Sequence, residues 1–453
     1  MSGARGGPGR SILRMGHPAQ YVVVAFVGAT LLGAMLLSIP AASHGPGRTS
    51  VMTALFTSAS AVCVTGLAVV DTPGHWTALG EWIILALVQI GGLGIMTLTS
   101  LIVVVVGRRL GLRQRLIAAA ETNSFDLGGI RAVLVGVAQL SFAVEAVVAL
   151  ALSLRFWWSH GEPLARAVYL GVFHSVSAFN NAGFSLFSEN LVRVNRDPFI
   201  LLVVAAAVVV GGVGFPVWVQ LARNPRRPRR WSLHAKITVL TTAVLLVAGW
   251  VLLAWLEWTN PDTLGGLSTA DSIVNALFHS VVPRTAGFNS VDVGAMREPS
   301  LLVTEVLMFI GGGSASTAGG IKVTTFALLG GMMWADLRGD PDVVMFERRI
   351  PNTAQRQALT VALLAIGVVV ASTMVLLASS KLPRSGLFFE AVSALGTVGM
   401  STGVTPLLST SSQLIVVALM IIGRVGPPTL FAALVLRNRD RLYRRPEERP
   451  IIG

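Results

Sequence analysis

Charge and cysteine are both scarce in this chain of 453 residues. Only 13% of the residues are charged, whereas soluble domains usually carry about 25%. The hydrophobic fraction is 53% and the mean hydropathy is +0.70. A single cysteine, Cys63, excludes an intramolecular disulfide and a cluster of thiolate metal ligands. The composition therefore excludes an ordinary soluble protein and favours one that crosses a membrane several times.

Eight apolar stretches are long enough to cross a bilayer as helices, which takes roughly 20 residues each. They lie near residues 20–40, 80–106, 132–154, 199–220, 237–256, 300–333, 358–378 and 412–436. The N-terminal segment is basic but has no short apolar core followed by a small-residue cleavage site. We therefore expect a cytosolic tail there and not a cleaved signal peptide.

Basic residues are distributed unevenly among the segments that connect these stretches. Of the 35 Lys and Arg residues, 24 fall in five segments separated by two spans each, namely the N-terminal tail, 107–131, 221–236, 335–357 and 437–449. Because cytoplasmic loops carry the excess of Lys and Arg, we expect these segments and both termini in the cytoplasm of a cell-membrane protein. No polar folded domain gathers the net charge of +13, so a nucleic-acid partner is not expected.

Four further segments, near 54–67, 171–184, 276–288 and 387–400, are apolar but rich in Ser, Thr, Asn and Gly. If all four crossed the membrane, the basic segments would alternate between its two sides. We therefore expect re-entrant loops, because non-helical backbone survives at membrane depth only where protein or a water-filled cavity satisfies it.

These four segments repeat one pattern at intervals of 117, 104 and 112 residues. Each has a Gly that follows small or β-branched residues and precedes a bulky apolar one: Gly66, Gly183, Gly287 and Gly399. A Gly-rich mark recurs in the helix that follows, beginning at Gly91, Gly211, Gly311 and Gly423. The repeat predicts an all-α membrane protein with four units of outer helix, re-entrant pore loop and inner helix, pseudo-fourfold around one pore. The expected units are 18–108, 109–225, 226–340 and 341–437, between cytosolic tails 1–17 and 438–453.

Four such loops around an axis would form a ring of backbone carbonyls, the device that replaces the hydration shell of K+ in selective pores. Glycine is needed because the backbone must reach dihedrals forbidden to residues with a Cβ. The candidate filter and K+-binding residues are Val64, Thr65, Gly66, Asn181, Ala182, Gly183, Thr285, Ala286, Gly287, Thr397, Val398 and Gly399. The alternative is that each Gly only ends a short helix, which would not explain four copies at nearly constant spacing.

Gly and other small residues interrupt the third inner helix and predict a flexible gate below the filter, since this composition cannot hold a continuous helix. The candidate gate residues are Gly311, Gly312, Gly313, Ser314, Ala315, Ser316, Thr317, Ala318, Gly319 and Gly320, with Lys322 beside them. Lys322 is expected either to pair with a carboxylate or carbonyl near the loop or to reach the cytosolic interface.

Arg424 is a further gate candidate, because it occupies the position held by Gly92, Gly212 and Gly312 in the other units. A charge within the membrane costs about 2.5–3.5 kcal/mol on insertion scales, so it should face a wet cavity or a partner. We expect it on the pore axis, where it would repel the permeating cation; a packed hydrogen-bond donor between helices is the alternative. Glu390 is expected to complement the N-terminus of the fourth pore helix.

At these residues the chain resembles the ion-translocating subunits of the Trk/Ktr/HKT superfamily of potassium transporters. The resemblance covers about residues 20–436, and its motifs lie at 60–67, 180–184, 283–288 and 311–325. The Ktr branch fits better than the Trk branch, whose members usually carry an extra pair of N-terminal spans. One departure is that residues 312–320 lack the Pro that the family often has there, which should loosen the loop.

The resemblance implies a homodimer with one pore per protomer and a cytosolic nucleotide-binding RCK ring (KtrA-like) as regulator. Nucleotides would then bind the partner, and this chain would need no cofactor beyond the permeant K+, with activation by Na+ left open. The basic segments could contact membrane lipid or the regulatory ring.

Two other functional classes are alternatives to a channel-like pore. A membrane-embedded enzyme is disfavoured because the within-span carboxylates Glu145 and Glu305 lie in no catalytic pattern. A secondary transporter with inverted repeats is disfavoured because two spans per unit return every unit to the same side. The sequence thus predicts potassium uptake through a pore, while Na+/K+ or H+/K+ symport and a sodium-selective pore stay as alternatives.

Overall fold

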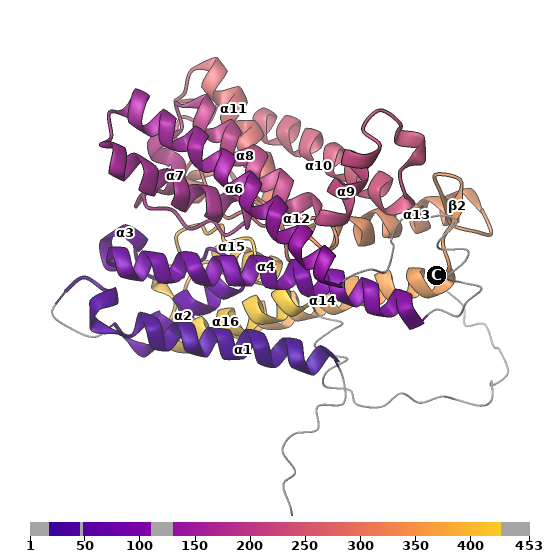
Figure 1. The fold of residues 1–453 in the computed structure, drawn as a ribbon, viewed down its shortest axis with the longest axis horizontal. Coiled ribbons are helices and arrows are strands. Elements are labelled where there is room, and N and C mark those ends of the chain that lie inside the picture. The colour runs from indigo at the N-terminus through magenta and orange to yellow at the C-terminus, as the bar shows by residue number, and fades with distance from the viewer. Residues whose placement is uncertain (1–17, 46–48, 110–129, 427–453) are drawn as a thin grey trace, which may run out of the picture.

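The structure, a computed structural model, describes residues 18–45, 49–109 and 130–426. These residues are almost entirely helical, and the long helices run roughly along one direction (Figure 1). The expected tails 1–17 and 438–453 lie outside the described residues, as does the last part of the eighth predicted span.

Four units follow one another along the chain, each with an outer helix, a shorter pore helix and an inner helix. The outer helices are α1 (Pro18–Leu37), α6 (Ile130–His160), α10 (Leu233–Glu257) and α14 (Asn352–Ser379). The pore helices are α2 (Val51–Val62), α7 (Leu164–Phe179), α11 (Thr269–Val281) and α15 (Arg384–Gly396). The inner helices are α4 (Ala78–Arg109), α8 with α9 (Pro198–Val213 and Phe215–Arg223), α12 with α13 (Glu298–Phe309 and Val323–Arg338) and α16 (Thr410–Val425).

Short elements connect these helices. They are α3 (Thr72–His75), η1 (Pro40–Ala42), η2 (Asn190–Val194), η3 (Pro228–Arg230), η4 (Val293–Ala295) and η5 (Thr405–Leu407). A two-residue antiparallel hairpin of β1 (Val344–Met345) and β2 (Arg348–Arg349) lies in one basic connection and was not predicted from the sequence.

Several helices are apolar enough to cross a membrane. Among the described residues, α6, α10 and α14 each meet the length and hydropathy needed for a span. Helices α8 and α9 meet it together but are bent by 98° at Gly214, whose φ is 100°. The prediction of one continuous helix over 199–220 is therefore wrong at this point: Gly214 turns the chain, and Pro216 starts a new helix at its second residue.

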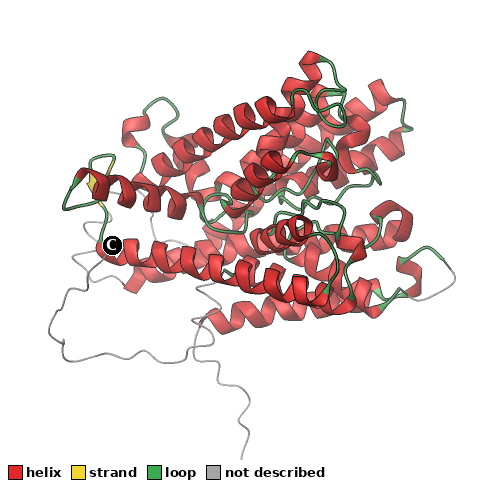
Figure 2. Cartoon of the chain, turned by 180° about the vertical axis from the view of Figure 1, so that it is seen from behind, coloured by secondary structure: helices red, strands yellow, loops and turns green. Residues whose placement is uncertain are grey.

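The units pack as a closed ring. Inner helix α4 contacts α6, α8 contacts α11, α12 contacts α15, and α16 contacts α2, so the fourth unit returns to the first. Figure 1 shows units 1 and 4 on one side of the molecule and units 2 and 3 on the other. From behind, Figure 2 shows loops gathered in the middle of the bundle, between the helices. This arrangement matches the predicted pseudo-fourfold order of the units.

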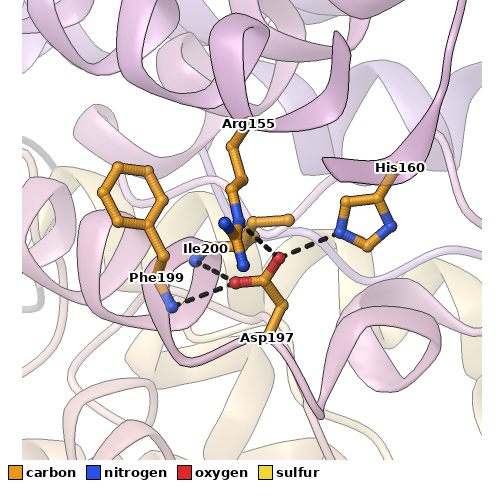
Figure 3. Close-up of polar contacts among 5 residues, drawn as sticks. All are labelled: Arg155, His160, Asp197, Phe199 and Ile200. Carbon is orange, nitrogen blue, oxygen red and sulfur yellow. Dashed lines mark hydrogen bonds and ion pairs between the residues drawn. The ribbon is translucent and has the colours of Figure 1, made fainter. Parts of the chain in front are cut away.

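Asp197 fastens one inner helix to its outer helix. Its carboxylate accepts hydrogen bonds from the backbone N–H groups of Phe199 and Ile200 and so caps the start of α8. The same carboxylate lies 2.8 Å from Arg155 Nε and 3.0 Å from His160 Nε2, both on α6 (Figure 3). The cluster thereby holds the start of α8 against the end of α6.

Candidate functional site

Each pore helix runs into a pore loop with the same backbone course; the four loops comprise residues 64–66, 181–183, 285–287 and 397–399. Their glycines all have positive φ, between 68° and 97°. The residue two positions before each glycine is also left-handed, with φ of 54°, 60°, 70° and 50° at Val64, Asn181, Thr285 and Thr397. Such a conformation costs about 1–3 kcal/mol for a residue with a Cβ, so the surrounding structure must hold it in place.

The pore loops meet around a common centre. A Cβ placed on each loop glycine would contact the carbonyl oxygen before the glycine of the next unit: Gly66 that of Ala182, Gly183 that of Ala286, Gly287 that of Val398, and Gly399 that of Thr65. A Cβ on Gly287 would lie 2.5 Å from Val398 O and 3.1 Å from Thr65 O. The loops therefore form a closed ring in which four equivalent carbonyls approach the loop of a neighbouring unit, and no Cβ fits at the glycines.

Serine hydroxyls support two of the loop glycines. The N–H of Gly66 donates to Ser60 Oγ at 3.0 Å, and the N–H of Gly399 donates to Ser393 Oγ at 3.1 Å. Ser177 occupies the same position in unit 2, but its hydroxyl donates to Phe184 O instead. Sequence reasoning missed these serines, although a Ser-Ala pair begins six residues before the glycine in three of the four units.

Two loop threonines have free hydroxyls. Thr65 and Thr397 are fully buried, and their Oγ1 atoms have no hydrogen-bond partner in the described part of the chain. Thr285 differs, because its Oγ1 lies 3.4 Å from Asn181 Nδ2 of the neighbouring loop. Buried hydroxyls normally find a partner, so the pair fits a loop surface that faces a polar ligand.

Polar side chains brace two pore loops from behind. In unit 2, Asn180 Nδ2 donates to Gln89 Oε1 at 2.9 Å and to Glu145 Oε1 at 3.2 Å, and Gln89 donates to the same carboxylate. In unit 3, Arg284 Nη2 donates to the carbonyl of Thr242 on α10 at 3.2 Å. The partners in both braces lie 35 to 91 residues away in sequence, so the sequence alone does not identify them.

Glu390 does not complement a helix N-terminus, and that expectation is wrong. Helix α15 begins at Arg384, so Glu390 lies in its middle, fully buried. Its Oε1 accepts hydrogen bonds from Ser401, just beyond the pore loop, and from Thr405. Glu390 thus ties the pore helix of unit 4 to the segment that leaves its loop.

The Gly-rich loop (residues 311–320) replaces the middle of the third inner helix, as its composition predicted. Ile310 and Ile321 form a bridge that closes its base. The N–H groups of Gly313 and Thr317 donate to Gly212 O and Gly211 O of α8, at 2.8 and 3.2 Å. Glycine is required here by close packing, since a Cβ on Gly312 would lie 2.5 Å from Gly212 O.

Arg424 joins the Gly-rich loop to two inner helices. It lies on α16, is 3% exposed, and donates from Nη1 to Thr317 O and from Nη2 to Gly91 O, the latter at 3.0 Å. Thr317 Oγ1 lies 3.3 Å from Asn181 Oδ1 in the second pore loop. This cluster therefore brings together residues of all four units.

Lys322 also binds carbonyls of the loop. Its Nζ donates to Ala318 O at 2.5 Å and to Gly319 O at 3.4 Å. Of the two expectations for Lys322, the structure shows the pairing with carbonyls near the loop.

Comparison with known proteins gives the family. Residues 10–443 match TrkH, described as a cation transport protein. The chain is 40% identical over 416 residues to the Ktr system potassium uptake protein B of Bacillus subtilis (strain 168), covering 91% of this chain and 92% of that protein. It is 37% identical over 439 residues to the protein of the same name from Vibrio alginolyticus, covering 97% and 95%. It is 35% identical over 442 residues to the potassium/sodium uptake protein NtpJ of Enterococcus hirae, covering 96% and 97%.

A solved structure agrees with this fold. The crystal structure of the potassium transporter TrkH from Vibrio parahaemolyticus superposes with a TM-score of 0.72 at 18% identity, covering 94% of this chain and 87% of that one. The predicted resemblance, the all-α membrane fold and the prediction of a transporter and not an enzyme are confirmed. The chain is a multi-pass membrane protein that belongs to the TrkH family of cation transport proteins.

Proposed function

We propose that this protein takes up K+ across the cell membrane through a pore whose selectivity filter is the ring of four pore loops. The observation that carries the proposal is the closed ring itself, in which each loop glycine lies against the carbonyl that precedes the glycine of the next unit. A ring of four carbonyls of this kind can replace part of the hydration shell of a cation. The K+-binding residues would be the twelve residues of the pore loops.

The pore helices support the same proposal electrostatically. Helices α2, α7, α11 and α15 each end with no more than three residues left before a pore loop. A helix C-terminus carries a partial negative charge of roughly half an elementary charge, which stabilises a nearby cation. Four C-termini directed at one ring therefore favour a cation there and disfavour an anion.

The Gly-rich loop, with Lys322 and Arg424, is proposed as the gate. Its backbone hydrogen bonds to α8 and its contact with Arg424 hold it beneath the pore loops. Opening would require these bonds to break, and the fixed charge of Arg424 would add an electrostatic barrier to a cation. Control of this step is assigned to a cytosolic RCK-type nucleotide-binding ring, because the chain resembles proteins named as parts of Ktr systems.

Potassium is the first choice of cation because two of the relatives are named potassium uptake proteins. Sodium is the second, as coupled ion, activator or substrate, because another relative is named a potassium/sodium uptake protein. The remaining parts of the proposal are a homodimer, cytoplasmic termini, and unit boundaries near 18–108, 109–225, 226–340 and 341–437.

Growth of cells that lack their own potassium uptake systems tests the proposal. Gly287→Ser places a side chain at φ 71° against the carbonyls of Val398 and Thr65, whereas Gly28→Ser on α1 meets no atom within 4 Å. Expressed with an RCK partner, the unchanged chain and Gly28→Ser should restore growth at low K+, and Gly287→Ser should lose it at equal membrane expression. Equal growth of the two variants would contradict the filter assignment, and no rescue by any chain would contradict potassium uptake.

A further inference from the structure

A continuous groove runs between units 3 and 4. Its wider part, of about 840 Å³, lies between α12 and the helices α14 and α15, and a narrower part of about 430 Å³ continues toward the Gly-rich loop. The two parts share four wall residues, Leu302, Glu305, Val370 and Phe388. This groove has no role in the proposed ion path.

Charges of both signs stand at the wide end of the groove. Glu298, at the start of α12, and Arg384, at the start of α15, both line it and are exposed. Within the described residues, neither side chain has a hydrogen bond or an ion-pair partner. The groove therefore offers an anion-binding and a cation-binding group at one end.

Two buried polar groups lie deeper in the same part of the groove. Glu305 is 9% exposed and Thr373 is 8% exposed, and they line it from the facing helices α12 and α14. Thr373 Oγ1 has no hydrogen-bond partner among the described residues, nor has the Glu305 carboxyl group. Glu305 lies seven residues, or about 10 Å, along the helix from Glu298. Polar groups at this depth need a partner, and the described part of the chain supplies none.

The narrow part of the groove is apolar. Its walls include Phe309, Ile310, Ile321 and Phe326, which flank the two ends of the Gly-rich loop. An occupant that reaches this part would contact the base of that loop. The shape and chemistry match a molecule with a charged end, a polar middle and a long apolar tail.

We propose that this groove binds one phospholipid with a zwitterionic, primary-amine headgroup, of the phosphatidylethanolamine class. Arg384 binds the phosphate, and Glu298 and Glu305 accept hydrogen bonds from the ammonium group. Thr373 donates to an ester oxygen of the glycerol, and an acyl chain fills the apolar part beside Ile310 and Ile321. A phosphatidylglycerol headgroup offers no ammonium to the two carboxylates, and the quaternary ammonium of phosphatidylcholine has no N–H to donate.

Native mass spectrometry of the purified full-length protein tests the proposal. The protein is exposed to an equimolar mixture of phosphatidylethanolamine, phosphatidylcholine and phosphatidylglycerol with the same acyl chains. One phosphatidylethanolamine per protomer should be retained at least fivefold over the other two lipids. Glu298→Gln and Arg384→Gln should remove this preference, whereas Glu189→Gln and Arg356→Gln, exposed residues outside the groove, should keep it. Equal retention of the three lipids, or an unchanged preference in both groove variants, would overturn the proposal.

Filling the groove distinguishes a lipid from a second copy of the chain. Val370 is 45% exposed and lines both parts of the groove, so Val370→Trp can occupy the space without entering the core. Loss of bound phosphatidylethanolamine with an unchanged oligomeric state supports the lipid. A lower dimer fraction with unchanged lipid retention would show that the groove receives another protomer and would overturn the lipid assignment. Because neither readout measures ion flux, failure of this proposal is distinct from failure of the proposed transport function.

Discussion

Strain at single residues accompanies the pore loops. Of the eight non-glycine residues with positive φ in the described chain, four occupy the same position, two before a loop glycine. Val64, Thr285 and Thr397 are β-branched, for which a left-handed backbone is a true outlier. Four unrelated turns would not share a strained residue at the same position. The left-handed conformation is therefore a common structural property of the four pore loops. The motif alone could not reveal this, because β-branched residues normally indicate extended backbone.

Removal of the Arg424 side chain should increase ion flux. Arg424→Ala deletes two hydrogen bonds to Thr317 O and Gly91 O and removes a fixed positive charge. A charged hydrogen bond contributes about 1.5–3 kcal/mol, and 1.4 kcal/mol is a tenfold change in an equilibrium. Rubidium uptake into proteoliposomes without activator should therefore rise roughly tenfold. Arg356→Ala, at an exposed position of α14, is the matched control.

An unchanged flux in Arg424→Ala would give Arg424 a different role. It would then be a hydrogen-bond donor that packs helices together and does not limit conduction. In that case the variant should show a lower midpoint of thermal unfolding, which separates loss of packing from loss of a gate.

The serine beneath one loop glycine should affect selectivity. Ser393→Ala leaves the Gly399 N–H without its acceptor, and a neutral hydrogen bond contributes about 0.5–1.5 kcal/mol. The loop should then hold its carbonyls less rigidly, and the K+/Na+ uptake ratio should fall about fivefold. Ser159→Ala, an exposed serine at the end of α6, should leave the ratio unchanged. A fall in expression with an unchanged ratio would mean that Ser393 acts only in folding.

At the scale of elements, sequence pattern predicted the repeat well and the breaks within helices less well. Apolar length and the four-times repeated glycine located the outer, pore and inner helices, because membrane depth demands about 20 apolar residues for each span. The bend at Gly214 was not predicted, because glycine in a membrane helix usually indicates close packing and only sometimes a turn. The prediction for Glu390 was wrong because the sequence does not locate the first residue of α15 to within two helical turns.

The equivalent glycines also behave differently from unit to unit. Gly91, Gly211 and Gly423 each lie against a carbonyl in the last turn of the pore helix of their own unit, whereas Gly311 lies against Gly319 of the Gly-rich loop. In these three units the glycine is needed for close backbone approach. In the third unit the loop itself occupies that space, which sequence similarity among the units does not reveal.

The stabilisation that the Asp197 cluster gives to the contact between α6 and α8 should depend on pH. Burial raises the pKa of Asp197, but hydrogen bonds from Arg155, His160 and Ile200 outweigh burial and hold the pKa below its ordinary value of 3.8. The carboxylate therefore stabilises the fold above pH 3.8, and this contribution is lost as the pH falls through the folded-state pKa. Asn retains the capping ability, so Asp197→Asn removes only the charge, which contributes about 1 kcal/mol at this partly exposed site.

Thermal unfolding in detergent measures this contribution. Asp197→Asn should lower the midpoint by about 2 °C at pH 7, and the difference from the unchanged protein should shrink once the pH falls below 3.8. Asp262→Asn, at an exposed position outside the Asp197 cluster, serves as the control. A difference that stays constant between pH 7 and pH 3.5 would contradict a role for the ionised carboxylate.

At the scale of the whole molecule, the ring order explains why four unequal units can share one site. Each inner helix contacts the next unit, and α16 returns to α2, so a displacement in one unit reaches its neighbours on both sides. Arg424 and the Gly-rich loop bond to residues of units 1, 2 and 3, and no other unit has an equivalent arginine or loop among the described residues. The pore loops therefore follow the pseudo-fourfold symmetry of the units. The parts proposed as the gate lie where that symmetry is broken.

The direction of the units in the membrane can be measured with single cysteines. Only Cys63 must first be replaced, and Cys63→Ala is a small change at a fully buried position. Arg229→Cys lies in the basic segment 221–236, and Glu189→Cys lies in the connection between the second pore loop and α8. Both positions are exposed.

Since Lys and Arg concentrate on the cytoplasmic side, a membrane-impermeant maleimide should label Glu189→Cys in intact cells and Arg229→Cys only in inverted vesicles. Asp262→Cys in unit 3 should behave like Glu189→Cys, because two spans per unit point all units in one direction. Labelling of Glu189→Cys and Asp262→Cys from opposite sides would contradict the parallel repeat, and labelling of Arg229→Cys in intact cells would reverse the orientation.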